Sequence, residues 1–210
     1  MTYLALILCV ALAFFLGSIP FGLVIAKTFK GIDPRKAGSG NIGSTNVARL
    51  CGLPWGIMTL FCDIMKGLLP VLLAVNVLPD PYMQSLVALA AVTGHIKSPF
   101  LGFKGGKGVA TTIGALIPPA FWPLLCAVLC CVAVIAVTRY VSLGSMVMAA
   151  SLVVFYALFG YFRLEPLAVV LLIMIVWAHR ANIGRLMRGE ESKFLAKKKE
   201  LSSKTKFRLS

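Results

Sequence analysis

Long apolar runs separated by short polar segments constrain this chain more than any other feature. A helix needs about 20 apolar residues to cross the hydrocarbon of a bilayer, and residues 3–26 and 53–78 reach that length. Hydrophobic residues make up 59% of the chain and charged residues 13%, against roughly half and a quarter in soluble domains. The pattern therefore predicts a polytopic membrane protein.

The remaining apolar runs predict further helices of unequal length. Residues 109–138 form one long run, but Pro118, Pro119 and Pro123 interrupt it. Because proline breaks a helix interior, we expect two short helices here, at about 109–120 and 123–138. The other expected helices lie at 82–96, 143–160 and from 167 onward. The predicted fold is all-α, with seven transmembrane helices of which two are short.

The positions of Lys and Arg predict the orientation in the membrane. Bases occur in the segments 27–49, 97–107 and 139–142, and ten of the 21 Lys and Arg lie from Arg180 onward. The turns at 79–81 and 118–123 carry none. Since cytoplasmic loops are enriched in bases, the N-terminus is expected outside and the C-terminus inside. We predict one transmembrane domain at 1–190 and a basic cytoplasmic tail at 191–210.

The net charge of +14 suggests either nucleic acid or an anionic membrane surface as a partner. The bases cluster beside the apolar runs, which favours lipid headgroups and argues against nucleic acid. The six cysteines form no metal-ligand pattern and lie mostly within apolar runs. We therefore expect neither a disulfide framework nor a metal site.

The first polar segment is dense in groups that bind anions. Glycines leave backbone N–H groups unobstructed, hydroxyls and amides add donors, and arginine offers a forked cation suited to phosphate. The alternative is an ordinary flexible polar loop. The density of donors favours phosphate binding. The residues concerned are Gly38, Ser39, Gly40, Asn41, Asn46 and Arg49.

The second polar segment combines glycines and lysines ahead of a predicted helix. Lys104, Gly105, Gly106 and Lys107 precede a helix that begins near Val109. Free N–H groups at such a helix start attract anions. The alternative is a basic loop that merely obeys the orientation rule, although that rule does not require the glycines. The segment does not match the ATP-binding P-loop pattern, so ATP is not predicted.

The third polar segment continues the last predicted helix beyond the membrane. His179 and Asn182 are three residues apart and are expected to share a helix face. His179 is either a proton carrier or a satisfied interface residue. Ser142 is predicted to cap the helix that follows it, and Ser145, one turn deeper, is predicted to reach the same site.

Two opposite charges lie within the second apolar run. Asp63 and Lys66 are three residues apart in the predicted helix. Charges at this depth are costly and usually functional. The two residues either have a function or only neutralise each other's charge, and the sequence leaves both interpretations open.

Taken in order, the three polar segments resemble the bacterial acyl-phosphate-dependent glycerol-3-phosphate acyltransferases. The matching motifs are 38–46, Gly94-His95 with 103–111, and His179-Arg180 with 182–186. The resemblance extends over residues 3 to about 190. It implies a multi-pass enzyme of the bacterial inner membrane whose active site faces the cytoplasm.

The resemblance also implies the reaction. A fatty acyl group would pass from acyl phosphate to the 1-hydroxyl of glycerol 3-phosphate, giving 1-acyl-glycerol 3-phosphate and phosphate, the first step of phospholipid synthesis. Acyl phosphate is already activated, so no cofactor and no metal is expected, and the favoured oligomeric state is a monomer. The base is either His179 or a phosphate oxygen of a substrate.

The implied site residues fall into two sets. The implied catalytic residues are Ser39, Arg49, Lys107, His179 and Asn182. The implied substrate- and phosphate-binding residues are Gly38, Gly40, Asn41, Asn46, Lys104, Gly105, Gly106 and Ser145.

Two other classes of protein compete with the enzyme. A transporter or channel for an organic phosphate would explain the broken helices and the intramembrane charges. Its binding site, however, is expected near the midplane, whereas the polar segments here gather at one face. A structural membrane protein would explain none of the glycine spacing.

Overall fold

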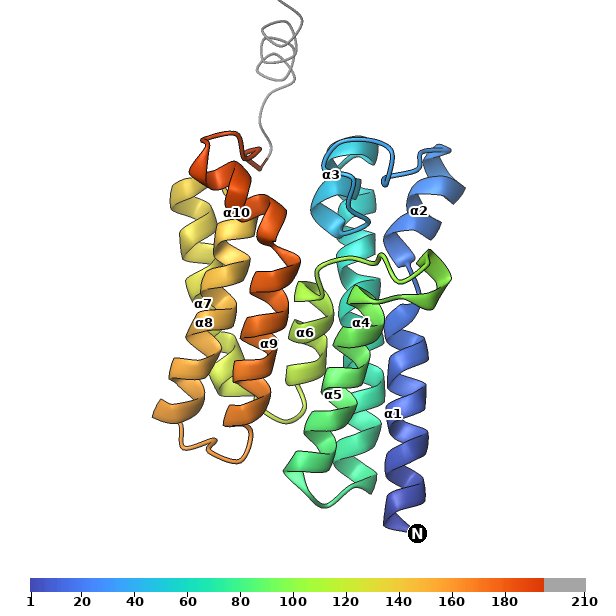
Figure 1. Ribbon diagram of the computed structural model, residues 1–210, viewed down its shortest axis with the longest axis vertical. Helices are drawn as coiled ribbons and strands as arrows, with labels where there is room; N and C mark the ends of the chain where they lie inside the picture. The colour runs from blue at the N-terminus through green and yellow to red at the C-terminus, as the bar shows by residue number, and fades with distance from the viewer. Residues whose placement is uncertain (195–210) are drawn as a thin grey trace, which may run out of the picture.

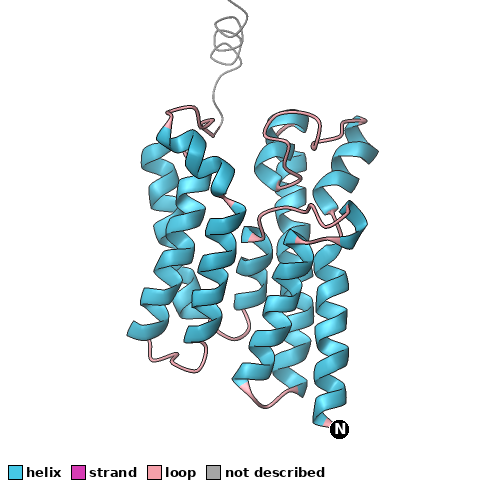
Figure 2. Ribbon diagram, in the orientation of Figure 1, coloured by secondary structure: helices cyan, strands magenta, loops and turns pink. Residues whose placement is uncertain are grey.

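The computed structural model describes residues 1–194, and their regular elements are all helical. Figure 2 shows helices joined by loops, with no strand in this part of the chain. The all-α prediction is confirmed there, whereas most of the predicted tail at 191–210 lies outside the described residues. The elements are α1 (Thr2–Ser18), α2 (Phe21–Lys30), α3 (Ser44–Cys51), α4 (Leu53–Val77), α5 (Pro81–Ile96), the 3-10 helix η1 (Pro99–Leu101), α6 (Val109–Leu116), α7 (Phe121–Thr138), α8 (Val141–Leu158), α9 (Glu165–Ala178) and α10 (Arg180–Met187).

The helices form two groups that stand side by side (Figure 1). In the first group, α1 to α6, the main contacts join α1 to α5, α4 to α6, and α3 to α4. In the second group, α7 to α10, helix α8 packs against both α7 and α9. Contacts of α5 with α9 and of α6 with α7 join the two groups along a seam. A ligand site at the end of this seam can therefore draw residues from both groups.

The outer faces of both groups are apolar, as a lipid-exposed protein requires. Exposed side chains include Ile7 and Phe61 in the first group and Val137 and Ile173 in the second. Four stretches are long and apolar enough to cross a membrane: 2–30, 53–77, 121–138 and 141–158. Helices α9 and α10 give a fifth if the bent pair is one span. The prediction of a multi-pass membrane protein is confirmed at this level.

The proline-rich stretch divides 109–138 into two helices as predicted, but only one of them is short. Helix α6 has 8 residues, whereas α7 has 18 and passes the length test for a span. Pro118 and Pro119 lie between the two helices. Pro123 lies in the first turn of α7, where a helix N–H has no partner to lose. The expected second short helix is therefore wrong, because Pro123 does not interrupt α7.

The last predicted helix is not continuous. It bends by 60° between α9 and α10 at His179, whose N–H is shared between the carbonyls of Ile175 and Val176. Asn182 N–H then donates to His179 O at 2.8 Å, which begins α10. The expectation of a straight helix leaving the bilayer is wrong, and the bend places α10 across the end of the second group (Figure 1).

Glycines let the helices of the first group meet backbone to backbone. A Cβ on Gly17 would collide with the backbone of α5, and one on Gly94 would collide with the backbone of α1. Helices α4 and α6 repeat this arrangement, because Gly67 touches the backbone of α6 and Gly114 touches that of α4. Small residues allow this close approach, which replaces the hydrophobic driving force that lipid does not supply.

Replacing Gly114 should therefore disrupt the first group. Gly114→Leu is expected to cost more than about 3 kcal/mol, beyond ordinary overpacking, and to lower Tm by about 10 °C. Thermal unfolding in detergent measures this. The matched control is Ala133→Leu, which adds three methylene-sized groups to an exposed position of α7 and should leave Tm nearly unchanged. Equal Tm values for both variants would contradict the packing argument.

Candidate active site

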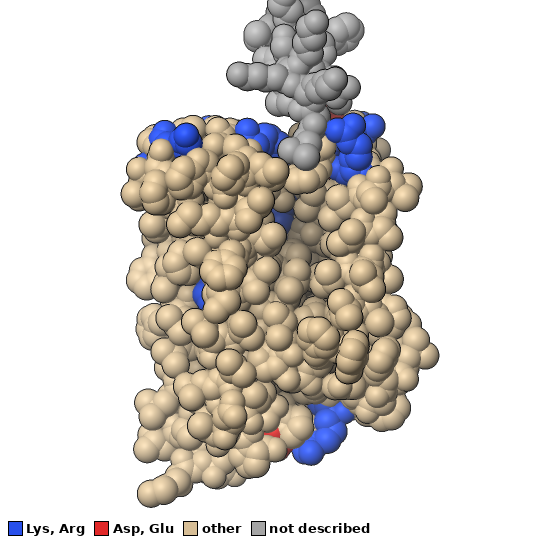
Figure 3. Space-filling model, turned by 180° about the vertical axis from the view of Figure 1, so that it is seen from behind, with Lys and Arg blue, Asp and Glu red and all other residues tan. Residues whose placement is uncertain are grey.

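Polar and basic residues gather at one end of the two groups. This end carries α2, α3 and α10 and lies opposite the N-terminus (Figure 1). Lys and Arg side chains line this end in the space-filling view, and a smaller basic patch marks the other end (Figure 3). The loop between α8 and α9, at that other end, carries Arg163, which pairs with Asp80 at 2.9 Å. We call the end with α2, α3 and α10 the polar end.

The loop between α2 and α3 is folded around the side chain of Asn46. Asn46 Oδ1 accepts the N–H of Ser39 at 2.9 Å. Asn46 Nδ2 lies 2.9, 3.2 and 2.8 Å from the carbonyl oxygens of Pro34, Ala37 and Asn41. The side chain is buried, and the loop itself occupies its hydrogen-bonding groups. We therefore correct its role from a phosphate ligand to the residue that builds this loop.

Three further predicted binding residues shape the same loop. Gly38 and Gly40 have φ of 62° and 71°, which favours glycine, and a Cβ on Gly38 would collide with Asn46. Asn41 Oδ1 accepts the N–H two residues ahead at 2.8 Å. Between the glycines, Ser39 is exposed at the polar end. The loop thus presents Ser39 while its other predicted ligands are engaged in its folding.

Arg49 points from the last turn of α3 toward the second group of helices. It is partly buried, and its charged neighbours are Glu191 and Arg185. Burial lowers the pKa of Arg49, the Glu191 carboxylate opposes this change, and Arg185 adds to it. An arginine remains charged at neutral pH under these conditions, so Arg49 contributes a fixed cation to the seam.

The segment 102–108, here called the glycine loop, turns back onto the end of α5. Gly105 N–H donates to Ile96 O and Gly106 N–H donates to His95 O, both at 3.0 Å. These two N–H groups are therefore not free for an anion, contrary to the expectation from the sequence. The unpaired amides expected at a helix start belong instead to the first turn of α6, two residues after Lys107.

Lys107 is a partly buried charged residue of the glycine loop. Burial lowers the pKa of Lys107 to about 8. The carboxylate of Glu191 acts in the opposite direction, whereas the positive charges of Arg185 and Arg49 lower the pKa further. Lys107, Arg49 and Arg185 thus form one electrostatic cluster at the seam, although they come from a loop, α3 and α10.

Glu191 holds together the part of the site that the second group supplies. Its Oε1 accepts hydrogen bonds from Ser142 Oγ at 2.7 Å and Asn182 Nδ2 at 2.6 Å. Its Oε2 accepts one from Arg185 Nε at 2.7 Å. Burial raises the pKa of Glu191, but these three donors outweigh that effect and hold the pKa below its ordinary value. The carboxylate therefore stays ionised and fixes α8 to α10.

His179 lies near Glu191 and its hydrogen-bond partners, at the bend between α9 and α10. Its Nδ1 is 2.8 Å from Ile175 O. Since a carbonyl only accepts, Nδ1 carries the hydrogen and Nε2 of the neutral ring carries a lone pair. The charges of Lys107 and Glu191 both act on this imidazole. The structure thus brings together four predicted residues, namely Arg49, Lys107, His179 and Asn182.

Three other predictions have different outcomes. Ser142 is not the expected helix cap, because α8 begins at Val141 and the hydroxyl donates to Glu191. Ser145 lies one turn deeper and is buried, with its hydroxyl donating to Val141 O at 2.9 Å. Lys104 is exposed and is not among the charges that act on Lys107.

Sequence reasoning missed Glu191 and the part played by Arg185. Glu191 lies in the predicted tail at 191–210, which is defined by its basic residues. Arg185 is one of the bases from which the orientation in the membrane is predicted. One available signal was that carboxylates are rare in this chain, with seven Asp and Glu in total. An acidic residue a few positions beyond a His/Asn motif is a candidate partner for nearby donors and cations.

Comparisons with known proteins identify the family of this chain. A family model described as glycerol-3-phosphate acyltransferase matches residues 7–189. Proteins of that name from Desulfovibrio desulfuricans and Lawsonia intracellularis are 51% and 48% identical, over 91% and 85% of this chain and 86% and 90% of their own. A Nitratidesulfovibrio vulgaris relative is 51% identical over 88% of this chain, which spans 57% of that longer protein.

Solved structures show the same likeness. The structure of PlsY, an integral membrane glycerol 3-phosphate acyltransferase, in its glycerol 3-phosphate form has a TM-score of 0.87 and 40% identity, over 90% of this chain and 96% of that one. Its lysophosphatidic acid form has a TM-score of 0.84 and 39% identity, over 90% and 95%. The family match, the identities and the shared fold agree: this chain belongs to the glycerol-3-phosphate acyltransferase family.

Proposed function

We propose that the chain transfers a fatty acyl group from acyl phosphate to the 1-hydroxyl of glycerol 3-phosphate. The products are 1-acyl-glycerol 3-phosphate and inorganic phosphate. The observation that carries this proposal is the cluster of Arg49, Lys107 and His179 at the seam, on a chain of this family. The relatives and the solved structures are named for glycerol 3-phosphate acylation.

The charge of the cluster suits a phosphate monoester. Arg49, Lys107 and Arg185 supply three cations, and Glu191 supplies one carboxylate. Two positive charges therefore remain uncompensated, and a phosphate monoester carries about −1.5 to −2 near pH 7. Arginine offers a fork to such a group and lysine a point charge. We assign Arg49 and Lys107 to phosphate binding and to stabilising charge on the departing phosphate.

The chemistry needs alignment and one proton transfer. The glycerol hydroxyl attacks the acyl carbon, the bond between that carbon and the phosphate oxygen breaks, and phosphate leaves with the bonding electrons. The hydroxyl proton passes either to His179 Nε2, which carries a lone pair in the tautomer described above, or to a substrate phosphate oxygen. Ser39, Ser145 and Asn182 are proposed to orient the substrates. Gly38, Gly40, Asn41, Asn46, Gly105 and Gly106 position the loops.

We further propose the placement of the chain in the membrane. Helices α1 with α2, α4, α5, α6, α7, α8 and α9 make seven crossings, with the N-terminus outside and the polar end in the cytoplasm of a bacterial cell. The basic residues at that end support this orientation. We place the boundary of the catalytic unit after Glu191 and not after residue 190, because that carboxylate binds Ser142 and Asn182. A monomer contains all of these residues.

The first test measures turnover by the purified protein. With palmitoyl phosphate and glycerol 3-phosphate, we expect phosphate release together with 1-acyl-glycerol 3-phosphate. Lys107→Ala and Arg49→Ala should each lower kcat/KM by about 100-fold or more, as expected for groups that stabilise developing charge. Lys36→Ala, at an exposed position of the polar end, is the control. Phosphate release unchanged in both site variants would refute the assignment, and glycerol 3-phosphate uptake without acylation would favour a transporter.

The second test is the pH dependence. Burial lowers the pKa of Lys107 to about 8, so the free protein loses this cation as pH rises through about 8. The second ionisation of a phosphate monoester, near pH 6, is then complete. We expect kcat/KM for glycerol 3-phosphate to fall above pH 8, after subtraction of spontaneous acyl phosphate hydrolysis. Lys107→Arg should move this fall above pH 10, and an unchanged profile would exclude Lys107 as its source.

The third test concerns the carboxylate that the sequence analysis missed. Glu191→Ala removes the acceptor shared by Ser142, Asn182 and Arg185, and leaving a buried donor without a partner costs about 1–3 kcal/mol. We expect kcat/KM to fall at least about 100-fold. Glu190→Ala removes the same charge one residue away, from an exposed pair with Arg188, and should retain activity. Similar losses in both variants would show that Glu191 has no special place in the site.

A further inference from the structure

A second polar cluster lies inside the first group of helices and takes no part in the proposed reaction. It consists of Asp63 and Lys66 in α4, His95 in α5 and Thr111 in α6, each less than 5% exposed. Ionisable side chains in a membrane interior are expensive and are usually kept for a purpose. Mutual neutralisation of Asp63 and Lys66 explains why the two charges are tolerated, but it does not explain the contacts with His95 and Thr111.

The charged pair is tied to neighbouring helices on both sides. Lys66 Nζ lies 2.7 Å from Asp63 Oδ1 and donates to Ile19 O at 2.7 Å. Ile19 is the residue at the break between α1 and α2, where Pro20 cannot donate to the helix. Asp63 Oδ1 in turn lies 3.8 Å from His95 Nδ1. The pair therefore connects the break in the first span to the end of α5.

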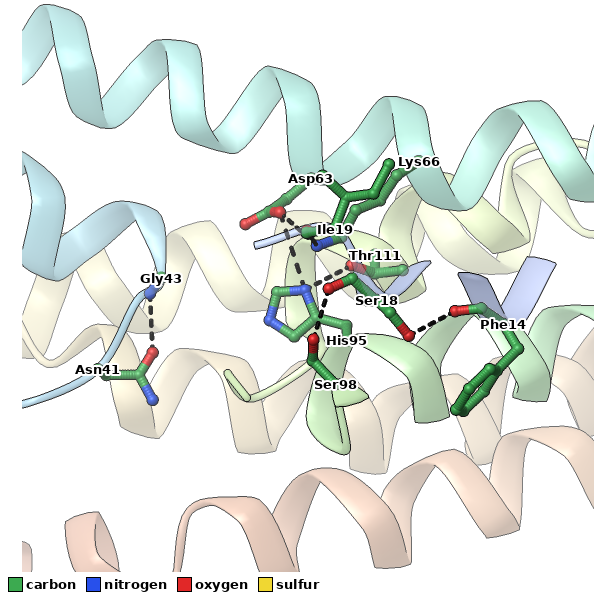
Figure 4. A network of polar contacts seen from close by, with 10 residues as sticks. All are labelled: Phe14, Ser18, Ile19, Asn41, Gly43, Asp63, Lys66, His95, Ser98 and Thr111. Atoms are coloured by element: carbon green, nitrogen blue, oxygen red, sulfur yellow. Dashed lines mark hydrogen bonds and ion pairs between the residues drawn. The ribbon is translucent and has the colours of Figure 1, made fainter. Parts of the chain in front are cut away.

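One hydrogen bond, to Thr111, fixes the imidazole of His95 on this side, and the carboxylate of Asp63 lies near the same nitrogen. The ring Nδ1 lies 3.0 Å from Thr111 Oγ1 and 3.8 Å from Asp63 Oδ1. Figure 4 shows the contacts with Asp63 and Thr111 meeting at the same nitrogen of the ring. Ser98 Oγ donates to Ser18 O at 2.6 Å, which ties the start of the following loop to α1. The ring is thus fixed in orientation by α4 and α6.

The opposite edge of the same ring lies against the glycine loop. A Cβ on Gly106 would collide with the imidazole at Nε2, so the loop backbone rests directly on the ring. Gly106 N–H also donates to His95 O, and Gly105 N–H donates to Ile96 O. Lys107 follows immediately. A rotation of the imidazole would therefore displace the backbone that carries the Lys107 ammonium.

We propose that Asp63, Lys66 and His95 are positioning residues that set the place of Lys107 through the glycine loop. This inference rests on the proposed phosphate-binding function of Lys107. The network acts only through Lys107, on phosphate binding and on the charge that this ammonium stabilises, because its members contact the loop and not the cluster of Arg49, His179 and Glu191. Asp63 and Lys66 thus lie at one edge of the His95 imidazole, and the opposite edge supports the glycine loop.

The test removes both charges together, so that no unpaired charge remains. Replacing a buried ion pair by apolar side chains is often tolerated by the fold. Asp63→Val/Lys66→Met should keep the thermal stability and raise KM for glycerol 3-phosphate by about tenfold. The value of kcat should fall with it, because a displaced Lys107 also stabilises the departing phosphate less well. The fall in kcat/KM that deprotonation of Lys107 causes above pH 8 should shift to higher pH by about one unit, since a looser loop exposes the ammonium to water.

Two matched variants separate positioning from simple neutralisation. Asp63→Asn/Lys66→Gln keeps hydrogen-bonding atoms without charge and should restore most of the binding. Thr59→Val removes another buried hydroxyl of α4, one that donates to Trp55 O in its own helix, and should behave as the wild type. If Asp63→Val/Lys66→Met fails to fold, Thr111→Val decides, with an expected rise in KM of about threefold.

The outcomes distinguish this inference from the proposed function. Absence of phosphate release by the wild-type protein would reject the function. An active wild type with unchanged KM and pH profile in the double variant and in Thr111→Val would reject the positioning network.

Discussion

Contacts between helix backbones at glycine are the interaction on which the first group of helices depends. Gly17 with Gly94, and Gly67 with Gly114, bring two helix pairs closer than any side chain would allow. Lipid supplies no hydrophobic force to hold helices together, so this proximity must come from packing and from polar contacts. It also lets one imidazole reach α4, α6 and the glycine loop. The position of Lys107 therefore depends on the close packing of these helices, through His95 and the glycine loop.

In the second group of helices, hydrogen bonds to a carboxylate organise the part that faces the site. This carboxylate is that of Glu191, and its donors come from α8 and α10. Neither group alone holds a complete cluster, because Arg49 and Lys107 belong to the first and His179 and Glu191 to the second. The proposed catalytic arrangement exists only where the two groups meet, so the seam is part of the proposed site.

Sequence reasoning identified the helices and the polar segments because their signals are local. Apolar runs, prolines and the spacing of Lys and Arg mark helices and loops directly, and Arg49, Lys107, His179 and Asn182 stood within recognisable motifs. The failures came from tertiary context. An asparagine that binds a ligand and one that builds a loop, as Asn46 does, look alike in sequence. The partnership of Ser142 with Glu191 spans 49 residues and depends on the bend at His179.

The uncompensated positive charge at the seam has a consequence for the folded state itself. Without an anion, Arg49, Arg185 and Lys107 repel one another across the boundary between the two helix groups, and Glu191 offsets only part of this repulsion. In the proposed function, a bound phosphate group offsets this repulsion and connects the two groups. Ligands that bind only the native state stabilise it by mass action. Under the proposed function, the supply of substrate would therefore affect the stability of the protein as well as its rate of turnover.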